Sequence, residues 1–137
     1  MKKWVYFFGI LLILAACSTQ KNALKVKTNE EQIAAEDSTE YDLETFDAKF
    51  ETWYITQNNP AMYRSQAYYE GWNKQYVTAW NIKATSGRRQ GFFEPIVGYD
   101  STVDYGFELN HHLFYYFQYV ENELKIKILS NSPNAIY

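Results

Sequence analysis

The sequence predicts a small, mainly helical α+β domain: three helices and two or three short strands in a single unit. In three stretches, apolar residues recur with a helical period. Shorter stretches near both ends alternate apolar and polar residues, as half-buried strands do. A chain of 137 residues has room for one domain and is short for two ordinary ones.

The N-terminus has the layout of a bacterial export signal. Met1-Lys2-Lys3 is a short positive segment, and residues 4–16 are almost entirely apolar. A helix of that length spans roughly 20 Å, whereas the bilayer hydrocarbon is about 30 Å thick. We therefore expect residues 1–16 to be a cleaved signal peptide rather than a membrane span.

Cys17 follows Leu14-Ala15-Ala16, an arrangement typical of a lipoprotein cleavage site. It is the only cysteine in the chain. We expect it to carry acyl chains that hold the protein on a lipid bilayer, because stable anchoring needs more than one chain. An acylated Cys17 leaves no thiol for a disulfide or a cysteine nucleophile.

A change in composition divides the rest of the chain. Residues 18–40 are polar and contain no aromatic residue, although aromatics make up 19% of the whole sequence. We predict a lipidated, flexible polar tether over residues 17–40. A globular aromatic-rich domain is then expected over residues 41–129, followed by a frayed tail over residues 130–137.

The first predicted elements are a strand over residues 41–46 and a helix that Asp47 caps and that runs to about Gln57. A second helix is predicted over residues 65–84. Its apolar stripe has helical spacing and consists of Tyr69, Trp72, Tyr76 and Trp80.

Residues 87–103 form a long connection, with a short strand expected at residues 96–99. The helical period returns at Asp104 and is expected to leave His111 and Gln118 on the polar face. A rival prediction makes Leu113 to Val120 one strand of a hairpin, and we favour the helix because its period persists for four turns.

Residues 124–129 alternate and predict a strand. We expect this strand to pair with residues 41–46 and so close the domain.

Two groups of residues resemble a known family. The first comprises Trp72-Asn73, Tyr76-Val77 and Trp80-Asn81; the second comprises Asp104-Tyr105-Gly106, Leu109-Asn110 and Leu113. Together they resemble a family of small uncharacterised lipoproteins from Bacteroidetes-type bacteria, over residues 41–129. One departure is Lys83, where the family pattern has Arg. The resemblance implies a location and a fold but no reaction.

The aromatic stripe of the second helix is either core or a platform for a ligand, and helical spacing favours core. The candidate binding residues are Trp72, Asn73, Tyr76, Trp80, Asn81, Arg88 and Arg89. No catalytic residue is predicted.

No metal site and no cofactor are predicted. His111 and His112 are adjacent, and neighbours on a helix point about 100° apart, which does not suit one metal ion. Asp100, Asp104 and Glu108 are four residues apart but lack a calcium-loop pattern, and a helix cap is favoured for Asp104.

The expected function is a non-catalytic binding or structural module on the periplasmic face of the outer membrane. Residues 18–22 contain no acid, which favours that face, and the partner would be an envelope protein or glycan. The net charge of −3 and the lack of a basic stripe argue against nucleic acid as the partner. The alternative is a small cell-wall or glycan hydrolase using paired carboxylates. Its candidate acids are Glu44, Glu51, Glu70 and Glu94.

Overall fold

The computed structural model describes residues 24–28, 41–45, 47–86, 91–96 and 98–134. Its elements in chain order are β1 (Lys25–Thr28), β2 (Tyr41–Glu44), α1 (Ala48–Gln57), a 3₁₀ turn (Pro60–Met62), α2 (Gln66–Thr85) and α3 (Gly106–Asn122). Three helices with a two-stranded antiparallel sheet confirm the predicted fold class. No helix in these described ranges is long and apolar enough to cross a bilayer.

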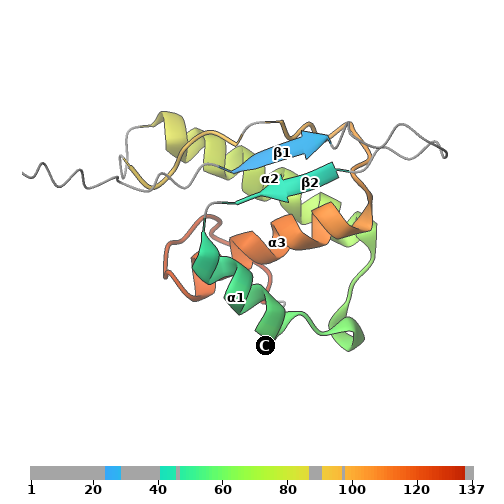
Figure 1. Cartoon of the computed structure of the whole chain (residues 1–137). Helices are drawn as coiled ribbons and strands as arrows, with labels where there is room; N and C mark the ends of the chain where they lie inside the picture. Colours follow the sequence, from blue (N-terminus) through green and yellow to red (C-terminus); the bar gives the residue numbers. More distant parts are fainter. Residues whose placement is uncertain (1–23, 29–40, 46, 87–90, 97, 135–137) are drawn as a thin grey trace, which may run out of the picture.

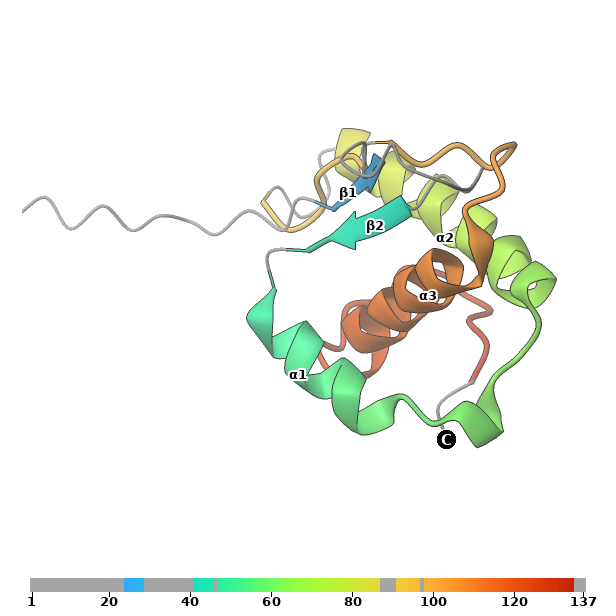
Figure 2. The ribbon, with the colours of Figure 1, turned by 45° about the vertical axis from the view of Figure 1, so that its right-hand side comes forward.

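Helix α3 is the centre of the domain, and α1, α2 and β2 all pack against it (Figure 1). In Figure 2, α1 lies on one side of α3, α2 on another and the β-hairpin above. Eleven residues of α3 are buried, from Leu109 to Val120 apart from His112. The prediction that His111 and Gln118 lie on an exposed face is therefore wrong, because α3 has neighbours on several sides.

Local signals determine the bounds of α1 and α2. Asp47 accepts hydrogen bonds from the backbone N–H groups of Lys49 and Phe50, at 3.0 and 3.3 Å. Ser65 accepts one from Tyr68 at 3.2 Å. These caps satisfy N–H groups that have no partner within the helix. Both helices begin where the sequence predicts.

Strand β2 confirms the strand predicted at residues 41–46, but its partner differs from the prediction. It pairs with β1, with Leu43 opposite Val26. The Lys27 ammonium and the Glu44 carboxylate form an ion pair of 2.8 Å across the hairpin. Leu24, just before β1, is 1% exposed and belongs to the core. The segment expected to be a flexible tether, residues 17–40, thus contributes a buried side chain and a strand to the domain.

The strand predicted at residues 124–129 does not form. The chain turns after α3, with Lys125 at a φ of 56°. The N–H groups of Ile128 and Leu129 donate to a Glu121 carboxylate oxygen at 2.7 and 2.9 Å instead of to a neighbouring strand. No strand forms in the described part of residues 96–99 either. The tail prediction over residues 130–137 lies partly outside the described residues.

Candidate functional site

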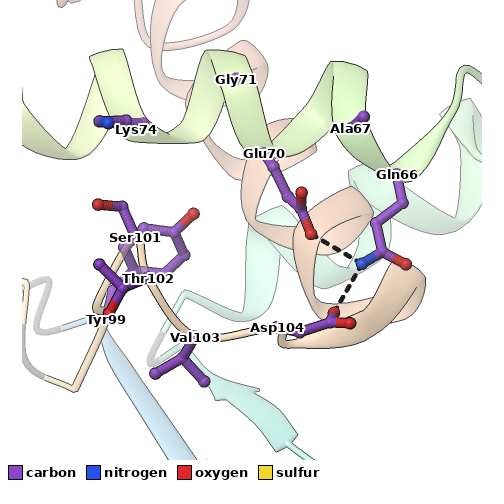
Figure 3. Close-up of a pocket in the computed structure, with 10 residues that line it drawn as sticks. All are labelled: Gln66, Ala67, Glu70, Gly71, Lys74, Tyr99, Ser101, Thr102, Val103 and Asp104. Carbon is purple, nitrogen blue, oxygen red and sulfur yellow. Dashed lines mark hydrogen bonds between the residues drawn. The ribbon is translucent and has the colours of Figure 1, made fainter.

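An open cleft of about 440 Å³ lies between one face of α2 and the loop that leads into α3 (Figure 3). Carboxylate, ammonium, amide, phenol and hydroxyl groups line it. The lining residues are Gln66, Ala67, Glu70, Gly71 and Lys74 of α2, with Tyr99, Ser101, Thr102, Val103 and Asp104 of the loop.

Helical spacing explains which residues of α2 line the cleft. Gln66, Glu70 and Lys74 are four residues apart, so their side chains share one face of the helix. Gly71 lies between them without a side chain, and a Cβ built there would meet no atom within 4 Å. The face therefore combines polar groups with open space above the helix backbone.

The loop wall is held by its own hydrogen bonds. The Tyr105 hydroxyl donates to the Gly98 carbonyl at 2.9 Å and accepts from the Asp100 N–H at 2.7 Å. The Asp100 carboxylate in turn accepts from the N–H and the hydroxyl of Thr102. The Tyr99 ring stacks on Tyr105 at a centroid distance of 5.1 Å. Burial, reinforced by the Glu70 charge, raises the pKa of Tyr99 to about 12, so its phenol remains a neutral hydrogen-bonding group.

Two carboxylates converge at one end of the cleft. The side-chain nitrogen of Gln66 donates to an oxygen of Glu70 and to an oxygen of Asp104, at 2.7 Å in both cases (Figure 3). The same Asp104 oxygen accepts from the Gly106 N–H at the start of α3. Asp104 thus binds the first N–H of the helix, although the N-cap position belongs to Tyr105.

The cleft is joined to the core through two asparagines. The Asn110 amide donates to the Glu70 oxygen at 3.4 Å and to the Gly106 carbonyl at 2.8 Å. The Asn73 amide donates to the Asn110 carbonyl at 2.8 Å. Asn73 and Asn110 are both fully buried. These contacts fix the relative position of α2 and α3, and with it the two carboxylates.

The candidate residues Asn73, Tyr76 and Trp80 lie in the core rather than on a platform, since each is 0% exposed. Trp72 is half-buried and packs against the same core. Tyr76 and Trp80 contact Phe117 of α3. A stripe of helical spacing is core here because α3 covers it.

Asn81 and Trp80 attach the following loop to α2. The Trp80 indole N–H donates to the Glu94 backbone carbonyl at 2.6 Å, and the side-chain Oδ1 of Asn81 accepts from the Ile96 N–H at 2.9 Å. The candidates Arg88, Arg89 and Cys17 lie outside the described residues.

The two histidines lie between α1 and α3. Nδ1 of His111 shares a 2.9 Å hydrogen bond with the Tyr54 hydroxyl. Burial lowers the pKa of His111 to about 4. Aromatic rings surround the imidazole at centroid distances of 4.3–5.8 Å: those of Tyr54, Tyr63, Tyr69, Phe107 and Tyr115.

His112 stacks on Phe50 at 5.2 Å, and its Nε2 lies 3.4 Å from a Glu51 oxygen. Burial lowers the pKa of His112 despite that carboxylate. Neither histidine lines the cleft.

Of the four acids considered for hydrolysis, only Glu70 lines the cleft. Glu44 pairs with Lys27, and Glu51 lies beside His112. Within the described residues, no group of three or more His, Cys, Asp or Glu side chains is placed to hold a metal ion.

Sequence reasoning missed Gln66, Lys74 and Tyr99 as site residues. The spacing of Gln66, Glu70 and Lys74 signals a shared helix face, but such a face is usually only solvated. That it borders a cleft depends on the loop of residues 98–104, which has no periodic pattern.

Comparisons with known proteins place the chain in a family. No significant match exists among curated proteins or among solved structures. A family model described as "Family of unknown function (DUF6146)" matches residues 5–135. The matched range is nearly the whole chain and includes all of α2 and α3. The chain therefore belongs to the family of unknown function DUF6146.

Proposed function

We propose that this protein is a lipid-anchored cell-envelope module that binds an envelope component without catalysis. The anchor is Cys17, acylated after removal of residues 1–16. The absence of acids in residues 18–22 favours the periplasmic face of the outer membrane. Since Leu24 already belongs to the core, the chain between Cys17 and the domain spans at most roughly 25 Å. The domain therefore works close to the bilayer.

The observation that carries the binding function is the open polar cleft between α2 and the loop of residues 98–104. Its walls are positioned by hydrogen bonds inside the domain, so its polar groups are arranged before a ligand arrives. Preorganised polar groups in a concave site are what a binding module needs.

Acylation is tested by growing the host bacterium with a labelled fatty acid and comparing the wild-type chain with Cys17→Ser. We expect label on the wild-type protein alone, and a faster-migrating form after signal cleavage. Label on both proteins, or on neither, contradicts the anchor.

The binding function is tested by blocking the cleft without changing its charge. Gly71→Trp fills the open space above α2, where nothing lies within 4 Å of the new Cβ. Gln75→Trp is the matched control, because Gln75 is exposed on the same helix and does not line the cleft. After crosslinking in intact envelopes, we expect the wild type and the control to recover the same partner or glycan and Gly71→Trp to lose it. Equal recovery by all three argues against the cleft.

One observation favours a second candidate, the glycan hydrolase. Glu70 and Asp104 bind the same Gln66 nitrogen, so their oxygens are no further apart than twice 2.7 Å. Retaining glycosidases hold two carboxyl groups about 5–5.5 Å apart. Release of soluble fragments from dye-labelled cell wall, lost in both Glu70→Gln and Asp104→Asn, would establish this activity. Without release by the wild type, the hydrolase candidate is dropped, and the crosslinking experiment alone decides the binding function.

A further inference from the structure

The exposed face of α1 carries a shallow apolar groove of about 430 Å³. Ala48, Lys49, Thr52, Trp53 and Thr56 line it. The hydroxyls of Thr52 and Thr56 donate to helix carbonyls at 3.1 and 2.6 Å. Because these hydroxyls are used by the helix backbone, the two threonines contribute mainly their methyl groups to the groove. The groove is therefore mostly apolar although threonine and lysine help to line it.

Ile55 extends this face of α1. It follows Thr52 by three residues, so the two side chains are neighbours on the helix surface. Ile55 is 76% exposed, the largest exposed fraction among the large hydrophobic side chains of the described residues. A contiguous apolar surface of this kind marks a contact with a protein or a membrane. We call the groove residues together with Ile55 the α1 patch.

The charge on the α1 patch is positive. Lys49 is the one charged residue among those that line the groove. The acids of the same segment have other contacts, since the Asp47 carboxylate caps α1 and the Glu51 carboxylate lies 3.4 Å from His112. The patch thus contrasts with the net charge of −3 of the chain. Tryptophan, isoleucine and lysine on one helix face are typical of helices that lie in a membrane interface.

The N-terminal end of the chain enters the domain beside α1. Lys25 lies opposite Glu44 in the hairpin, and α1 begins at Ala48, four residues after Glu44. Figures 1 and 2 both show the start of α1 near the beginning of β1. Leu24 follows Cys17 by seven residues, which span at most roughly 25 Å. A bilayer that holds Cys17 is therefore within reach of α1, which is about 15 Å long.

From this arrangement we infer that the α1 patch lies on the surface of the phospholipid bilayer that holds Cys17. Trp53 and Ile55 contact the boundary between headgroups and acyl chains, and the Lys49 ammonium binds lipid phosphate groups. Because the anchor keeps the patch close to the bilayer, its effective concentration there is high, and a small apolar area suffices for docking. The inference rests on the lipid anchor of the proposed function and adds the face that the domain turns to the membrane.

Docking through α1 also orients the cleft. Helices α1 and α2 both pack on α3 and not on each other. In Figures 1 and 2 they lie on different sides of α3. The cleft, which α2 and the loop of residues 98–104 form, therefore lies on the side of the domain that is away from the bilayer.

A photoreactive side chain on the patch tests its contact with lipid. The full-length chain carries benzoylphenylalanine in place of Thr52 or, as the matched control, in place of Thr78, which is exposed on α2. Coupling of the Cys17 thiol to a maleimide lipid anchors both proteins in vesicles of phosphatidylethanolamine and phosphatidylglycerol. After irradiation, we expect mass spectrometry to find phospholipid adducts at position 52 and not at position 78.

Two variants separate the patch from exposed isoleucines in general. Ile55 and Ile82 are both exposed helix residues, at 76% and 61%. With the photoreactive group at position 52, Ile55→Glu should lower the yield of lipid adducts about tenfold or more, since the burial of one isoleucine is lost. Ile82→Glu should leave the yield unchanged. Lys49→Gln should lower it in these anionic vesicles and have little effect in vesicles of phosphatidylcholine.

Three results overturn the inference: equal lipid adducts at positions 52 and 78, adducts at position 52 with protein instead of lipid, or an unchanged yield in Ile55→Glu. The outcome is distinguishable from that of the proposed function, because maleimide coupling supplies the anchor chemically. If Cys17 takes up labelled fatty acid but no lipid adduct forms at position 52, the anchor stands and the docking face fails. If lipid adducts form as expected but Cys17 takes up no label, the patch binds lipid and the proposed anchor fails.

Discussion

Gly98, in the loop that forms one wall of the cleft, has no space for a side chain. Its φ is 85°, and an added Cβ would lie 2.5 Å from the carbonyl oxygen of Val26. The loop therefore passes against β1 at a distance that only glycine permits. This contact connects the wall of the cleft to the hairpin.

Gly98→Ala is expected to destabilise the fold by about 2 kcal/mol or more, because a left-handed backbone costs an alanine about 1–2 kcal/mol before the clash is added. Gly91→Ala is the control, since Gly91 has a φ of 105° and no atom within 4 Å of the added Cβ. Urea unfolding measures both. Equal destabilisation would mean that β1 does not press on the loop.

Glu121 connects the end of α3 to the last described segment. One oxygen accepts from Ile128 and Leu129, and the other accepts from the Tyr76 hydroxyl at 2.9 Å. Gln118 donates to the same hydroxyl. One carboxylate thus replaces the strand partner that residues 124–129 lack.

Glu121→Gln should lower the free energy of unfolding by about 1.5–3 kcal/mol, the cost of losing hydrogen bonds to a charged group. Hydrogen exchange at Ile128 and Leu129 should become faster. Glu123→Gln, an exposed neighbour, should stay within about 0.5 kcal/mol of the wild type. Unchanged exchange in Glu121→Gln would contradict the role of this carboxylate.

At the scale of elements, the contact of α1 with α3 is sensitive to acid. Phe50, Trp53 and Tyr54 of α1 pack on a surface of α3 that includes His111 and His112. Burial lowers the pKa values of both histidines. The acidic groups near His112, which are Glu51, Asp42 and Glu108, raise its pKa but do not outweigh burial. Both imidazoles are therefore neutral in the folded protein near pH 7.

The stability of the domain should fall as the pH drops from 6.5 to about 4. Between its unfolded pKa of 6.5 and its folded pKa of about 4, His111 binds a proton in the unfolded state only. Protonation then favours unfolding, on the order of 3 kcal/mol for the full shift. His111→Gln should be less stable at pH 7 but lose less stability on acidification. Parallel unfolding curves from pH 7 to 5 for both proteins would contradict this origin.

At the scale of the whole molecule, the domain begins before the aromatic-rich region. Leu24 is 1% exposed and lies in the same core as Phe50, Trp80 and Phe117. Strand β1 then covers one edge of β2 and borders Gly98. The N-terminal part of the chain is therefore structural as well as a connection to Cys17.

Leu24→Ala should destabilise the whole domain by about 2–5 kcal/mol, as expected for a buried leucine. Leu124→Ala is the matched control, because Leu124 is 36% exposed, and it should cost less than about 1 kcal/mol. Urea unfolding followed by tryptophan fluorescence measures both. Similar small effects would place Leu24 outside the cooperative core.

The helices and their beginnings were predictable because their signals are local. The Asp47 and Ser65 caps act on N–H groups two or three residues away, and the stripes of α1 and α2 repeat within each helix. The burial of His111 and Gln118 was not predictable in this way. It depends on neighbours that α3 acquires from distant parts of the chain.

The sequence alone determined the three-helix plan and favoured a core role for the stripe of Tyr76 and Trp80, and the tertiary structure decided that role by covering the stripe with α3. The acylation of Cys17 stays a prediction. Only the tertiary structure decided that β1 pairs with β2, because a four-residue strand in a polar segment gains its stability from the partner strand. It also decided the cleft. Glu70 and Asp104 are distant in sequence, and the Asn73–Asn110 contact between α2 and α3 brings them to one Gln66 amide.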